Sequence, residues 1–162
     1  MKPWNKRPRE IRNLFNPVFC SLVIVRGIQG FSTQKKEPIP FSLALLILPI
    51  CLHKQTRELF KKSSRTYFTK IVQNHPEIKI DFAKRAEQLL PYTMEAFAYL
   101  SAFDYIDVNE AGAIQLTHRK IRKSIVGSND SKDCQKVALS IGKKMAAIDD
   151  RVTIYTTLGI RP

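Results

Sequence analysis

Cysteine and histidine are the residue types in this chain with the clearest capacity for chemistry. Cys51 and His53 form a Cys-x-His pair that would supply two ligands to a zinc ion, but no further ligands follow at the spacing of a zinc site. His75 precedes a proline and His118 ends a predicted strand, which is typical of polar surface histidines. We therefore interpret Cys51 as a buried thiol and His53 as a histidine at a helix end.

Carboxylates and glycines offer no catalytic pattern either. Asp149 and Asp150 form an adjacent carboxylate pair that would suit a divalent ion, but we interpret them as a cap for the segment that follows. The sequence has no glycine-rich phosphate loop, nucleophile elbow or Cys/His nucleophile pair. We expect no catalytic, cofactor-binding or metal-ligating residue, and we predict that the protein is not an enzyme.

Basic side chains are the remaining candidates for function. The 162 residues hold 27 Lys and Arg against 14 Asp and Glu, a net charge of +13. The candidate contacts to a partner or to phosphate lie in an N-terminal arm and in a later connector: Lys6, Arg7, Arg9, Arg12, Arg119, Lys120, Arg122 and Lys123. A solvated face, an acidic protein partner and nucleic acid are the three interpretations that these charges leave open.

Residues 1–62 are predicted to form the basic arm and apolar helices. The first twelve residues resemble an extended arm, and Asn16 followed by Pro17 predicts a helix over 17–28 that ends near Gly27 and Gly30. The apolar run 41–52 predicts a buried helix bent at Pro49, because it is shorter than the ~20 residues that span a bilayer.

Residues 63–118 are typical of a winged helix-turn-helix. Ser64 is predicted to cap a helix that ends at His75, a second helix covers 80–90, and a third begins at Pro91. Two alternating strands, 105–108 and 113–117, then form a hairpin around an Asn-Glu-Ala-Gly turn.

Residues 119–162 complete the chain with the basic connector, a C-terminal helix and a tail. Ser131 is predicted to cap a helix whose apolar face runs from Cys134 to Ile148, and the tail from Asp149 forms a short helix or an added strand. The predicted fold class is mostly α with a small β-hairpin: a winged helix-turn-helix-like domain with additional N-terminal and C-terminal helices. At this length, we expect the three parts to form one compact domain.

The charge distribution of the predicted winged-helix segment argues against recognition of a DNA sequence. Residues 71–118 carry 3 basic and 7 acidic side chains, and the predicted recognition helix 91–104 has no Lys, Arg, Asn or Gln but contains Glu95. Base edges in the major groove are read mainly by those four residue types. The segment is therefore better suited to protein docking than to sequence readout.

The same features argue for the cytoplasm and against a membrane. Three widely spaced cysteines are typical of a reducing compartment. The apolar stretch 14–25 follows basic residues as in a signal peptide, but Asn16, Pro17 and Ser21 interrupt it, and no small-residue cleavage site follows.

Four blocks of sequence resemble a known family. Residues 1–17, 48–58, 64–67 and 154–162 are similar to the middle component of prokaryotic three-component ABC systems, a group that includes the Lamassu-type anti-phage systems. The resemblance implies a non-enzymatic adaptor in anti-phage or anti-plasmid defence, which links an ABC ATPase resembling SMC or Rad50 proteins to an effector such as a nuclease. DNA would be reached through the complex, and no catalytic or ligand residue carries over. The alternative is a winged-helix DNA-binding protein or transcription regulator.

Overall fold

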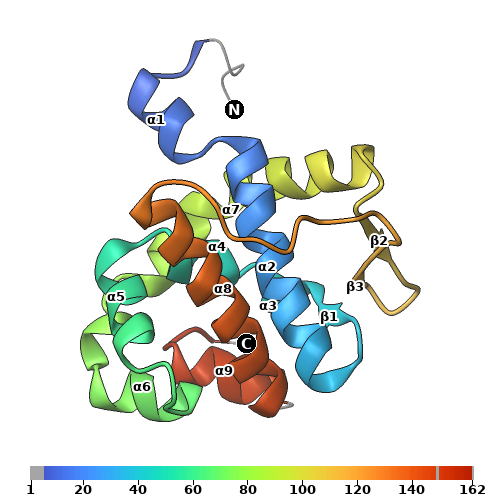
Figure 1. The fold of residues 1–162 in the computed structure, drawn as a ribbon. Helices are drawn as coiled ribbons and strands as arrows, with labels where there is room; N and C mark the ends of the chain where they lie inside the picture. The colour runs from blue at the N-terminus through green and yellow to red at the C-terminus, as the bar shows by residue number, and fades with distance from the viewer. Residues whose placement is uncertain (1–5, 149, 162) are drawn as a thin grey trace.

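The computed structural model describes residues 6–148 and 150–161, and it is mostly helical with a small antiparallel sheet (Figure 1). Helix α2 packs against α8 through the middle of the fold (Figure 1). The elements in chain order are α1 (Arg9–Leu14), α2 (Pro17–Lys35), β1 (Ile39–Pro40), α3 (Phe41–Ala44), α4 (Ile47–Cys51), α5 (Lys54–Lys62), α6 (Phe68–Asn74), η2 (Pro76–Lys79), α7 (Phe82–Ala102), β2 (Ile106–Val108), β3 (Ala113–Leu116), α8 (Asn129–Ile148) and α9 (Arg151–Thr157). The mostly helical class with a hairpin is confirmed.

Helix α2 begins as predicted but continues further than predicted. The Asn16 side chain accepts a hydrogen bond from the Val18 amide at 2.9 Å, which caps the first turn. The helix does not end at Gly27 and Gly30 but continues to Lys35, and both glycines are sites of close packing: a Cβ atom on Gly27 would lie 2.4 Å from Cδ1 of Ile47 in α4. A Cβ atom on Gly30 would lie 2.0 Å from the carbonyl oxygen of Leu139, and one on Gly142 would lie 2.0 Å from that of Gly27. Glycine marks a close helix contact here rather than a helix end.

The α2 region also has the composition of a membrane span. Among the described residues, the helical stretch Ile11–Lys35 is long and apolar enough to cross a bilayer, and 59% of its most apolar window is buried inside the fold. A core helix has the same length and hydropathy, so this feature is weak evidence about a membrane.

The apolar run 41–52 is buried as predicted, but it is divided differently. It forms two short helices, α3 and α4, and the break lies at Leu45 and Leu46 rather than at Pro49. Pro49 is the third residue of α4 and has no N–H to donate to the carbonyl of Leu45. It is tolerated because the amides of the first helical turn have no acceptor within the helix. Helix α5, which follows, was not predicted.

The winged-helix prediction fails at its central turn. The helices expected over 80–90 and from Pro91 form one continuous helix, α7, with Pro91 inside it. Pro91 and Glu87 are both exposed, so the carbonyl that Pro91 cannot bond faces water. Helix α6 is confirmed, although Tyr67 rather than Ser64 precedes its first turn. A winged helix-turn-helix is therefore not confirmed by the described residues.

The predicted hairpin is confirmed and gains a third strand. Strands β2 and β3 pair antiparallel, with Asp107 opposite Gln115. Strand β1 adds to the other edge of β3, with Ile39 opposite Ile114, which gives the order β1-β3-β2. This pairing joins the N-terminal part of the chain to the hairpin.

The C-terminal helix α8 has the predicted apolar face, but it does not begin at the predicted cap, Ser131. The apolar face of α8 from Cys134 to Met145 is buried. The helix begins before Ser131, and the Ser128 hydroxyl accepts from the Ser131 amide at 3.3 Å. The tail forms helix α9, one of the two predicted outcomes. Asp150 caps it, and Asp149 lies outside the described residues.

Asp150 is expected to make the stability of α9 depend on pH. Its carboxylate accepts hydrogen bonds from the side chain and amide of Thr153 and from the amide of Val152, and these bonds lower its pKa. Because the pKa of Asp150 is lowered in the folded state, the ionised cap contributes its full stabilisation above about pH 4. This stabilisation is lost as the pH falls through the lowered pKa. Asp150→Asn should keep the cap and remove this loss. Thermal unfolding at pH 7 and pH 3 should show a larger decrease in Tm for the wild type than for the variant. Identical decreases would contradict the assignment.

Candidate interaction surface

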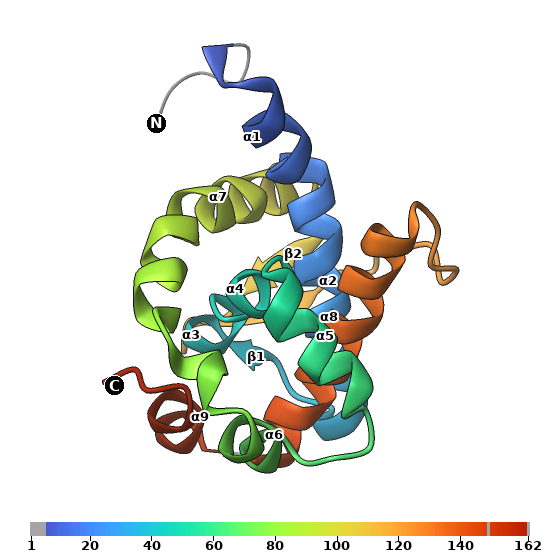
Figure 2. The same cartoon turned by 90° about the vertical axis from the view of Figure 1, so that its left-hand side faces the viewer.

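One of the four predicted N-terminal basic residues, Arg7, is engaged within the fold. Arg7 is buried and donates two hydrogen bonds to the carboxylate of Glu95 on α7, at 2.7 and 2.9 Å. Nearby, the rings of Phe15 and Tyr92 stack with centroids 4.4 Å apart. Figure 2 shows the α1 segment beside the C-terminal part of α7. The pair holds the arm against its own chain, so Arg7 is not displayed to a partner.

The rest of the arm is also more ordered than an extended segment. Arg9 and Arg12 lie in helix α1, where Arg9 is exposed and Arg12 is half-buried. Lys6 is exposed, and the first five residues lie outside the described part of the chain. The prediction of an extended arm is therefore wrong for residues 9–12, which lie in α1.

The connector displays all four of its predicted basic side chains. Arg119, Lys120, Arg122 and Lys123 are exposed, on a segment without helix or strand that crosses α2 between the hairpin and α8 (Figure 1). The structure thus brings one of the two predicted basic groups together on an open surface.

The connector is anchored by Arg26, a buried arginine that was not predicted to have this role. Arg26 of α2 is 4% exposed, and its guanidinium donates to the carbonyl oxygen of Arg122 at 2.6 Å and to Gln29 at 2.8 Å. Burial lowers the pKa of Arg26. The sequence did offer one sign of this role. Arg26 lies within an apolar helix, and an arginine buried there needs a specific hydrogen-bond acceptor. The main chain of the connector is consequently held while its own side chains project outward.

An apolar groove lies beneath this basic segment. It has a volume of about 370 Å³ and is formed by α2, the C-terminal end of α7 and the connector. We call it the connector groove, and its lining residues are Val18, Ser21, Leu22, Val25, Tyr99, Leu100, Tyr105, Lys120, Ile121 and Arg122. Among the residues that the structure describes, the lining includes Lys120 and Arg122 but no Asp or Glu.

Exposed apolar side chains adjoin the groove. Val18 is 53% exposed, and Phe103, which packs on Tyr99 with ring centroids 4.6 Å apart, is 50% exposed. The Arg119 guanidinium lies 5.8 Å from the centre of the Tyr105 ring. Apolar surface bordered by cations fits a partner segment with apolar and acidic residues, since both the burial and the charge would be complementary.

A comparison with protein families identifies the chain at this point. The family model for the ABC-three component (ABC-3C) system Middle Component 3 matches residues 4–162. The chain belongs to this family. No curated protein and no solved structure matches it.

In this Middle Component 3 chain, the thiol and imidazole groups remain separate from the groove. Burial raises the pKa of Cys51 well above its ordinary value, and the Cys134 thiol donates to the Cys51 carbonyl at 3.4 Å. His75 lies 3.2 Å from the carboxylate of Glu77 and His118 is exposed. Within residues 6–148 and 150–161, no group of three His, Cys, Asp or Glu side chains is arranged to hold a metal ion.

Proposed function

We propose that this middle component is a non-enzymatic adaptor that links an ABC ATPase resembling SMC or Rad50 proteins to an effector such as a nuclease. The observation that carries the proposal is the family match over residues 4–162. The resemblance of the four sequence blocks supports a role in Lamassu-type anti-phage or anti-plasmid defence in the cytoplasm. The basic, apolar connector groove is the surface that we assign to partner docking.

The physical form of the groove supports a protein partner. A partner would bury Val18, Phe103 and the groove lining, and the four exposed cations of the connector would pair with its carboxylates. We place the ATPase here because an apolar centre bordered by charge is the usual composition of a stable protein interface.

The alternative, a winged-helix DNA-binding protein, has less support. The segment that would read bases is the C-terminal half of α7, which carries no Lys or Arg, and its Glu95 is engaged by Arg7. We do not propose direct DNA contact by the connector, and the DNA-binding measurement below would detect it.

Co-expression with an ABC ATPase of the SMC or Rad50 type, taken from a neighbouring gene that encodes one, tests the proposal. We expect the two proteins to elute as one complex in size-exclusion chromatography, with a mass from light scattering that includes both. A monomeric chain that elutes apart from the ATPase and has no measurable affinity for it would contradict the proposal. Sequence-selective, salt-dependent DNA binding by the isolated chain would instead support the alternative.

A further inference from the structure

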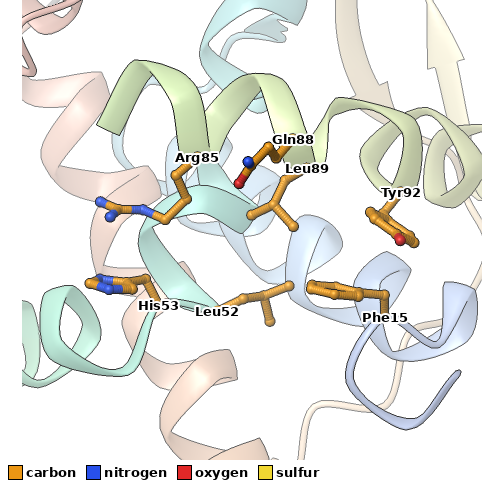
Figure 3. A pocket seen from close by; sticks show the side chains of 7 residues that line it. All are labelled: Phe15, Leu52, His53, Arg85, Gln88, Leu89 and Tyr92. Atoms are coloured by element: carbon orange, nitrogen blue, oxygen red, sulfur yellow. The ribbon is translucent and has the colours of Figure 1, made fainter. Parts of the chain in front are cut away.

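A second cleft, which shares no lining residue with the connector groove, lies between α7 and the junction of α4 and α5 (Figure 3). Its volume is about 360 Å³, near the lower end of the range for small-molecule sites. Arg85 and His53 lie at one end of the cleft, and the aromatic rings of Phe15 and Tyr92 lie at the other (Figure 3). The two ends therefore offer different chemistry.

Arg85 is a cation whose hydrogen bonds within the fold are long, and its guanidinium lies 5.1 Å from the centre of the Phe82 ring. Its guanidinium donates to Thr56 Oγ1 at 3.5 Å and to the carbonyl oxygen of Ile78 at 3.4 Å, both at the long limit of a hydrogen bond. Its Nε is buried and has no hydrogen-bond partner in the described part of the chain. Burial lowers the pKa of Arg85, and the negative charge of Asp81 raises it by a smaller amount. An anion in the cleft would give the terminal nitrogens of this guanidinium closer acceptors than Thr56 and Ile78 provide.

His53 presents a second donor beside it. The Nδ1 atom accepts from the Thr56 amide at 3.4 Å and lies 2.8 Å from the Thr56 hydroxyl, a pattern that assigns the ring proton to Nε2. Burial, then Arg85 and Arg57, lower the pKa of His53. The two terminal nitrogens of Arg57 donate to the Cys51 carbonyl at 2.9 Å and to Asp130 at 3.0 Å, while its Nε, like that of Arg85, has no hydrogen-bond partner in the described part of the chain. His53 thus remains a neutral N–H donor in a positive environment.

The described residues that line the cleft include no Asp or Glu, and its other end is apolar. Leu52 and Leu89 lie between the cationic end and the Phe15–Tyr92 stack, and the amide of Gln88 lies along the same wall (Figure 3). A free hydrated ion would leave the apolar end uncovered, whereas a ligand with a ring or short hydrocarbon body would bury it.

We propose that this cleft binds a phosphate or carboxylate group carried on a small aromatic or apolar body. The guanidinium of Arg85 and the Nε2–H of His53 donate to the anion, and the body packs against Leu52 and Leu89. This inference does not depend on the adaptor function, because neither the connector nor its groove takes part.

The three histidines of the chain allow a direct test by NMR. Inorganic phosphate, phenyl phosphate and benzoate are titrated into the full chain while the ring signals of His53, His75 and His118 are followed. We expect a saturable shift of the His53 signal, a rise in the pKa of His53 as the anion offsets the charges of Arg85 and Arg57, and no change at the other two histidines. Phenyl phosphate or benzoate should bind at least about tenfold more tightly than inorganic phosphate, because the ring buries apolar surface.

Two matched variants locate the binding. Arg85→Gln should weaken phenyl phosphate or benzoate at least about tenfold, and Lys84→Gln, which removes an exposed charge from the adjacent residue, should leave binding unchanged. Tighter binding of phenyl phosphate identifies a phosphorylated ligand, and tighter binding of benzoate identifies a carboxylate ligand. A wild-type His53 signal that no probe shifts would overturn the proposal, as would equal affinities of the two variants when both are folded.

Discussion

Reversal of the four connector charges is expected to reduce the affinity for the proposed ATPase partner at least about 100-fold, because an attraction at the interface rim becomes a repulsion. The variant carries Glu in place of Arg119, Lys120, Arg122 and Lys123. These side chains are exposed, and the bond that anchors the segment joins Arg26 to a main-chain carbonyl, which the substitutions retain. The Tm should therefore change little. The affinity is measured by calorimetry at low and high salt, and the loss should be larger at low salt.

A control with the same change in net charge separates the surface from the overall charge. Lys70, Lys84, Lys136 and Lys143 are exposed and lie outside both the connector and its groove. Their replacement by Glu should weaken binding much less than the connector variant does. Equal weakening by the two variants would indicate general electrostatic attraction and would contradict docking at the connector.

The contact between α2 and α8 gives the largest predicted effect on stability. Gly30→Ala and Gly142→Ala each place a methyl group 2.0 Å from a backbone carbonyl oxygen, so the two helices must separate. Alanine is favoured over glycine inside a helix by about 1 kcal/mol, but overpacking against a rigid backbone should outweigh this and destabilise by about 3 kcal/mol or more. For a chain of this size, we expect a decrease in Tm of about 10 °C.

Gly112→Ala is the matched control for these substitutions. Gly112 has a φ of +71°, and a Cβ there would meet no atom within 4 Å, so only the cost of a left-handed alanine, about 1 kcal/mol, applies. Thermal unfolding of the three variants compares the two costs. A Tm for Gly30→Ala at or above that of the wild type would contradict the close contact between α2 and α8.

Local patterns predicted most of the elements, but not how they join. The spacing of apolar residues identified the buried faces of α6 and α8, and the Asn-Glu-Ala-Gly turn identified the hairpin. Pro91 led to a wrong helix break, because its exposure on the solvent face of α7, which makes it tolerable, depends on the tertiary fold. The pairing of β1 with β3 likewise has no local signal, since two residues of strand are too few to show alternation.

The candidate surface was predictable in charge but not in geometry. Both basic groups were visible in the sequence, yet Arg7 pairs with Glu95 across 88 residues and Arg26 anchors Arg122 across 96. Single-sequence periodicity reports on neighbours along the chain and carries no information on such distant partners. For the same reason, Arg85 and His53 gave no sign that they share a cleft.

Hydrogen exchange of the connector in the purified complex with the ATPase tests the central claim most directly. Residues 118–124 have no helix or strand, so their amides should exchange rapidly in the free chain. If the connector groove docks the ATPase, exchange in this segment should slow at least about tenfold in the complex, while the exposed loop around Gly112 should not change. Unchanged exchange at 118–124, with new protection elsewhere on the chain, would contradict docking at the connector groove.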